Sequence, residues 1–125
     1  MICEFGAEGN IQAIENAFQH CAMNHGFRYQ THFNFETADR FGALLEAAGF
    51  KVEACYTYDR PTPLQGEEGI RDFVRQFYVK ELAALPDAEQ QQIAWEMDVL
   101  LKPVLWDGTQ WIADYKRLRA VAGRP

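Results

Sequence analysis

Apolar and polar residues alternate along some stretches of the chain and recur at helical spacing along others. A strand-like run over residues 2–6 breaks at Gly6, and residues 50–57 alternate strictly. Residues 110–121 form the longest strand candidate. The pattern therefore predicts three strands. In the second of them, the alternation places four residues on one face, namely Phe50, Val52, Ala54 and Tyr56.

Apolar residues three and four positions apart predict helices between these strands. Thr37 is typical of an N-cap, and the acidic Asp39 in the first turn favours the helix dipole. Gly49 stops this helix, and Pro103 stops the last one. The spacing predicts four helices, over residues 10–24, 37–49, 70–78 and 86–101.

The remaining segments read as loops. Residues 28–35 are extended or irregular and rich in aromatic side chains, and residues 106–108 form a turn. Residues 59–69 are a rigid loop, because Pro61 and Pro63 fix φ and two glycines follow.

The predicted order is strand, helix, helix, strand, helix, helix, strand. This order describes a single α/β domain over residues 1–125, with a small three-stranded mixed sheet and about four helices. A three-stranded sheet leaves an edge open unless another strand pairs with it. We therefore expect something to complete this sheet.

Composition narrows the class of protein. The chain has 125 residues, with 48% hydrophobic and 24% charged residues, which are the proportions of one globular domain. It has no long apolar run and no basic segment followed by an apolar one, so we expect a cytoplasmic protein with no membrane partner. The net charge of −6 argues against a nucleic-acid partner, since the dense basic group is small, namely Lys116, Arg117 and Arg119.

Four blocks of sequence resemble, in order, the C-terminal half of class I S-adenosylmethionine-dependent methyltransferases, nearest to the trans-aconitate methyltransferase group. They are "CEFGAEGNIQAI", "FNFETADRFGALLEAAGFKVE", "DRPTPLQGEEGIRDFVRQF" and "DGTQWIADYKRLRAVA". Family motifs are matched in the first, third and fourth blocks by Glu4, Phe5, Gly6, Gly9, Asn10, Arg60, Pro61, Thr62, Leu64, Trp111, Asp114, Tyr115, Arg117, Leu118 and Arg119. Ala7 replaces a family glycine, and residues 33–36 stand where the family has W-Y-F-P.

The resemblance implies half of a Rossmann-like domain, in which the last strand lies antiparallel between the other two. Family members bind S-adenosylmethionine on a glycine-rich turn and an acidic strand end, and G-x-G-x-G is absent from this chain. We interpret "FGAEGN" as a structural turn. The resemblance thus implies a truncated methyltransferase-like protein that binds no cofactor alone, is not catalytic alone and completes its sheet as a homodimer.

Two other readings stay open. The chain is alternatively the acceptor-side subunit of a split methyltransferase, with a separate cofactor-binding partner chain. It is otherwise a module that binds a small molecule or a protein and reuses the acceptor pocket.

The resemblance also implies a substrate-binding set. Phe33 and Phe35 would form an aromatic wall, and Arg60, Tyr115 and Arg117 would clamp a small acidic acceptor. No catalytic residue is assigned. The competing interpretation is that the two phenylalanines belong to the core and the charged residues form surface ion pairs.

Histidines and cysteines suggest a metal only weakly. Cys21 and His25 are four residues apart on a predicted helix, near His20 and His32, but no C-x-x-C completes a ligand set. We predict no metal site. Three widely spaced cysteines indicate reduced thiols rather than disulfides.

Overall fold

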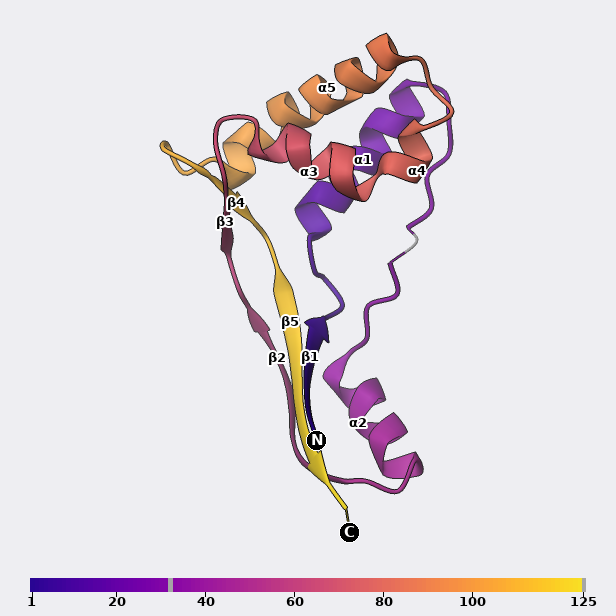
Figure 1. Ribbon diagram of the computed structural model, residues 1–125, viewed down its shortest axis with the longest axis vertical. Coiled ribbons are helices and arrows are strands. Elements are labelled where there is room, and N and C mark those ends of the chain that lie inside the picture. The colour runs from indigo at the N-terminus through magenta and orange to yellow at the C-terminus, as the bar shows by residue number, and fades with distance from the viewer. Residues whose placement is uncertain (32, 125) are drawn as a thin grey trace. The chain divides into compact units, whose positions relative to one another are not determined.

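The computed structural model of the protein describes residues 1–31 and 33–124. Contacts divide the chain into two compact units. The sheet unit comprises Met1–Ile11, His32–Pro61 and Asp114–Pro125, and the helical unit comprises Gln12–Thr31 and Thr62–Ala113. The elements, labelled in Figure 1, are β1 (Ile2–Gly6), α1 (Gln12–Asn24), α2 (Ala38–Ala47), β2 (Lys51–Asp59), β3 (Thr62–Leu64), α3 (Gly69–Phe77), α4 (Val79–Leu82), α5 (Asp87–Leu105), β4 (Trp111–Ala113) and β5 (Lys116–Gly123).

The sheet unit contains a three-stranded sheet in the order β1-β5-β2, with its strands side by side in Figure 1. β5 pairs antiparallel with both neighbours, so β1 and β2 run in the same direction. The α/β class and the central place of the last strand are confirmed. Both ladders are antiparallel rather than mixed, and the described residues form five helices rather than four.

One face of this sheet is covered by α2. Alternate residues of β5, namely Leu118, Ala120 and Ala122, are buried against it together with Leu45 of α2. The helix begins as predicted, because the Thr37 hydroxyl oxygen accepts the backbone N–H of Arg40 at 3.1 Å. The intervening β5 residues therefore point to the opposite face of the sheet.

The prediction that alternate residues from Phe50 to Tyr56 share one face of β2 is wrong, because the strand contains a bulge. Val52 pairs with Ala122 and Ala54 pairs with Val121, so one residue is extra in β2 between these pairs. Val52 consequently packs in the core under α2, whereas Tyr56 lies on the open face and is 46% exposed. The strict alternation of the sequence hides this change of face.

The predicted strand over residues 110–121 is divided in two. β4 pairs with β3 in the helical unit, and β5 lies in the sheet unit. Between them, the carbonyl of Asp114 accepts the N–H of Ile11 at 2.9 Å, and the carbonyl of Tyr115 accepts the N–H of Arg60 at 2.8 Å. These bonds to chain segments outside the ladders interrupt the strand.

The predicted loop over residues 59–69 also contains a strand, β3. Pro63 lies within it and pairs with Ile112 of β4. A two-stranded ribbon has a free edge on each strand, so the missing N–H of a proline is tolerated there.

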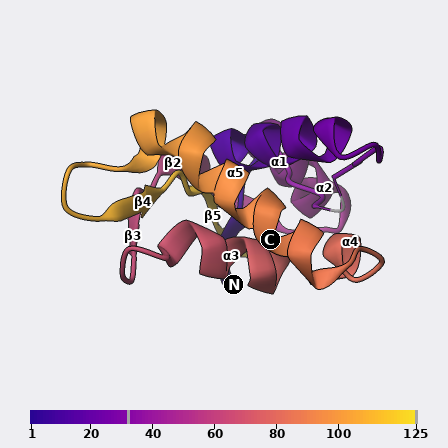
Figure 2. The same ribbon diagram turned by 90° about the horizontal axis from the view of Figure 1, so that it is seen from above.

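In the helical unit, α5 contacts both α1 and α3, and Figure 2 shows the three helices beside one another. The rings of Phe18 and Tyr78 stack in the core with centroids 4.0 Å apart. Glu15 of α1 accepts the hydroxyls of Tyr78 at 2.6 Å and of Tyr29 at 2.7 Å. These bonds satisfy two buried phenols that would otherwise be costly to bury.

α5 continues past its predicted end, through Pro103 to Leu105. The proline lies in the last turn, where its missing N–H removes only one helical hydrogen bond. Leu101 and Leu105 on either side of it are buried and hold this turn in the core. In the part of the chain that the structure describes, no helix combines the length and the apolar character that crossing a membrane requires.

Candidate functional site

The open face of the sheet carries a cluster of charged side chains around Glu4. Cross-strand register puts Glu4 beside Arg119, and Arg119 beside Tyr56, in one row across the sheet. The next row contains Gly6, Arg117 and Tyr58. Every second residue along a strand points to the same face of the sheet. The side chains of these two rows therefore lie together on the side away from α2.

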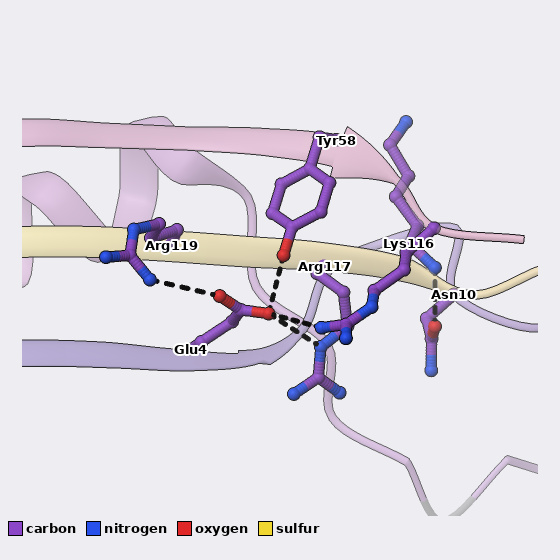
Figure 3. Close-up of polar contacts among 7 residues, drawn as sticks. Glu4, Asn10, Tyr58, Lys116, Arg117 and Arg119 are labelled. Carbon is purple, nitrogen blue, oxygen red and sulfur yellow. Dashed lines mark hydrogen bonds and ion pairs between the residues drawn. The ribbon is translucent and has the colours of Figure 1, made fainter. Parts of the chain in front are cut away.

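The Glu4 carboxylate accepts from several neighbours at once (Figure 3). Its Oε1 atom accepts the Tyr58 hydroxyl at 2.5 Å and Nη1 of Arg60 at 3.2 Å. Nε of Arg117 lies 3.6 Å from the same oxygen, and Nη1 of Arg119 donates to Oε2 at 3.3 Å. We call these five residues the Glu4 cluster.

The Glu4 cluster is positively charged overall. Three guanidinium groups surround one carboxylate, which gives the cluster a formal charge of +2. The hydrogen bond from Tyr58 and the three arginines hold the pKa of Glu4 below its usual value, although partial burial opposes them. The same hydrogen bond raises the pKa of the Tyr58 hydroxyl. Both groups therefore keep their carboxylate and phenol forms at neutral pH.

The cluster lies toward one end of the sheet. β1 ends at Gly6 and β2 ends at Asp59, immediately before Arg60, and the two strands run in the same direction. Their carboxyl ends therefore meet at the same edge, beside the start of β5 at Lys116. In open α/β sheets the carboxyl ends of parallel strands are where ligands bind.

The two phenylalanines of the predicted aromatic wall lie beside this end of β1. The rings of Phe33 and Phe35 are stacked, with centroids 5.4 Å apart and planes 6° from parallel. A Cβ atom on Gly6 would lie 2.8 Å from Cε1 of Phe35, so the absence of a side chain at Gly6 gives this ring its place. Gly6 is the cross-strand partner of Arg117.

Tyr115 contributes through its backbone. Its carbonyl accepts the N–H of Arg60 and so fixes the start of the segment that follows β2. Its half-buried side chain has a raised pKa because burial outweighs the effect of Arg117. The structure thus brings Arg60 and Arg117 together on one carboxylate, with Tyr115 beside them. Phe35 packs against Gly6, the cross-strand partner of Arg117.

Three members of the Glu4 cluster have no predicted role, namely Glu4, Tyr58 and Arg119. Two of them carry a sequence signal, because Arg119 is two residues from Arg117 and Tyr58 is two residues from Tyr56. Glu4 is a motif match of the first block, but the motif assigns it no binding role, since that role depends on which β5 residue stands opposite it.

The turn after β1 is structural, in line with the interpretation of "FGAEGN". The Asn10 side-chain oxygen accepts the N–H of Lys116 at 2.6 Å, and Asn10 is buried. Gly9 has φ of +91°, which favours glycine. The space above Gly6 is filled by the Phe35 ring and the Asn10 amide. This turn therefore does not fit an adenosyl cofactor, which needs open backbone at such glycines.

His20, Cys21 and His25 lie in the helical unit. Nδ1 of His25 lies 3.0 Å from a Glu89 oxygen, and Nε2 lies 2.6 Å from a Glu96 oxygen. Cys21 is buried, and burial raises the pKa of its thiol to about 11. His32 lies outside the described residues. Within residues 1–31 and 33–124, no group of three or more histidine, cysteine or acidic residues could hold a metal ion.

Comparison of the chain with protein-family models and with curated proteins finds no match. The methyltransferase resemblance therefore stays a prediction that rests on the residues of the four blocks.

Proposed function

We propose that this chain supplies the acceptor-binding side of an S-adenosylmethionine-dependent methyltransferase-like domain in the cytoplasm and is not catalytic alone. The observation that carries the proposal is the strand order β1-β5-β2 with β5 antiparallel. The resemblance predicts this arrangement for the last three strands of such a domain, and a strand order is a property of the whole sheet unit rather than of one motif.

The Glu4 cluster supports a small acidic acceptor. Arg60 and Arg117, both named by the resemblance, converge on one carboxylate oxygen. Guanidinium groups bind carboxylates with charge-assisted hydrogen bonds in a fixed geometry. An acceptor with carboxylate groups would therefore be held and oriented at this end of the sheet, and orientation is the main requirement of an in-line methyl transfer.

The chain's own residues supply binding rather than the methyl group. S-adenosylmethionine is the methyl donor of the family, and the glycine turn after β1 does not fit it. We therefore expect the cofactor-binding strands to come from outside residues 1–125.

The open edge of β1 supports completion of the sheet by a second copy of the chain. Met1 and Ala122 exchange backbone hydrogen bonds of 2.7 and 3.0 Å, and Ala7 donates to Lys116 at 2.8 Å. Odd-numbered residues of β1 therefore bond to β5, and the N–H and C=O groups of Ile2 and Glu4 point to the outer edge. The same edge on a second copy is complementary to it about a twofold axis.

The acceptor-side proposal is tested by isothermal titration calorimetry of the full chain. We expect citrate to bind, and Arg117→Gln to weaken binding by about tenfold or more because a charge-assisted contact is lost. Arg40→Gln is the matched control, since Arg40 pairs with Glu36 and Glu8 instead of Glu4. We expect no micromolar binding of S-adenosylmethionine to the chain alone. Equal citrate affinity in the Arg117 variant and the wild type would contradict the proposal.

A further inference from the structure

The place that an acidic ligand would take in the Glu4 cluster is held by the protein's own carboxylate. Oε1 of Glu4 accepts from Tyr58 and Arg60 and lies beside Arg117, whereas Oε2 accepts from Arg119. Glu4 lies on β1 opposite Arg119, so its carboxylate reaches the guanidinium groups without any change in backbone conformation.

We propose that Glu4 is a specificity-determining residue of this site, because its carboxylate competes with any ligand carboxylate for Arg60 and Arg117. The inference rests on the proposed acceptor function. It assigns the site to ligands with two or more carboxylates and predicts that it rejects monocarboxylates.

The competition follows from the covalent attachment of Glu4. A tethered group acts at an effective concentration on the order of millimolar or higher. A monocarboxylate offers the arginines the same single group and has no such advantage. A ligand with several carboxylates can engage Arg60 and Arg117 together and so gains more than displacement of Oε1 costs.

The exposure of the arginines indicates where the ligand enters. The Arg60 side chain is 61% exposed, whereas Arg117 and Arg119 are 31% and 38% exposed. An incoming anion therefore meets Arg60 first and then Arg117. Glu4 can keep its contact with Arg119 through Oε2, so its displacement is partial and the sheet need not open.

The test compares acetate, succinate and citrate as ligands of the full chain by isothermal titration calorimetry. In the wild type we expect affinity to rise steeply from acetate to citrate. Glu4→Gln keeps the size of the side chain and removes its charge. Acetate affinity should therefore rise by about tenfold or more, and the ratio of citrate affinity to acetate affinity should fall. Glu8→Gln is the control, because Glu8 pairs with Arg40, which is not a member of the cluster.

The outcomes separate the two proposals. If citrate binds and Glu4→Gln leaves the ratio of citrate to acetate affinity unchanged, the role of Glu4 is overturned and the acceptor site stands. If none of the three anions binds the wild type or Glu4→Gln, the acceptor function fails and the role of Glu4 fails with it.

A second measurement needs no variant. The side-chain carboxyl ¹³C signal of Glu4 reports its pKa in the wild type. Saturation with citrate should raise this pKa toward the usual glutamate value, because two arginines leave the carboxylate. An unchanged pKa under citrate saturation would show that the ligand leaves Glu4 undisturbed, which would overturn the inference.

Discussion

Gly6 shows how one missing side chain shapes the site. It is the last residue of β1, and its φ is not positive, so its role is spatial rather than conformational. The ring of Phe35 fills the space that a side chain would take, with Cε1 2.8 Å from the position of an added Cβ. This close approach places the aromatic pair next to the row that contains Arg117.

Gly6→Ala should therefore destabilise the protein. The added methyl group would force the Phe35 ring to move, and overpacking of this kind costs about 1–3 kcal/mol. Urea unfolding followed by circular dichroism measures the loss. Gly123→Ala is the matched control, because an added Cβ there meets nothing within 4 Å. Equal stability of the two variants would contradict the packing of Phe35 on Gly6.

At this scale the sequence named two members of the Glu4 cluster in advance. The family resemblance pointed to Arg60 and Arg117, which the structure brings to one carboxylate. Glu4 was visible only as a motif match, since its partner Arg119 stands 115 positions away along the chain. A contact between distant strands depends on their register, and hydrophobic alternation leaves register undefined to within two residues.

At the scale of elements, helix starts and strand order were more predictable than interruptions. The cap at Thr37 was predicted because it depends on neighbouring residues. The break between β4 and β5 was missed because it depends on bonds from Ile11 and Arg60, which are distant in sequence. The bulge in β2 was missed for the same reason, since a bulge is defined by the partner strand.

The junction between α1 and α5 has a pH dependence that belongs to this scale. His25 follows the last residue of α1 and contacts Glu89 and Glu96 of α5. Burial lowers the pKa of His25, but the two glutamates outweigh it, so the net shift is upward from 6.5. The protonated histidine therefore stabilises the folded state.

The free energy of unfolding should fall as the pH rises from below 6.5 through the raised pKa of His25. In that interval the folded state holds a proton that the unfolded state has lost, and one proton gives a slope of at most about 1.4 kcal/mol per pH unit. Urea titrations at several pH values measure the slope. His25→Gln should flatten it, whereas the exposed His20→Gln should preserve it. A slope that persists in the His25 variant would contradict this account.

At the scale of the whole molecule, the sheet unit and the helical unit interleave along the chain, so neither is a continuous segment. The helical periodicity predicted the helices. It could not predict the division into two units, because that division depends on which distant segments of the chain contact one another. The strand order was predicted only through the family resemblance. Its agreement with the structure is the main support for the proposed function.

The open edge of β1 is the feature on which the account of the whole molecule depends. Ile2 is 65% exposed there, and its outward N–H would pair with a second copy. Ile2→Pro removes this N–H without removing a bond to β5, so it should break the association and keep the fold. Ile2→Val keeps the N–H and serves as the control.

Size-exclusion chromatography with light scattering tests this most directly. We expect the wild type and Ile2→Val to have twice the chain mass of 14.4 kDa, and Ile2→Pro to have the mass of a single chain. A wild-type protein that elutes at the mass of one chain, even at the highest concentration it reaches, would contradict completion of the sheet by a second copy.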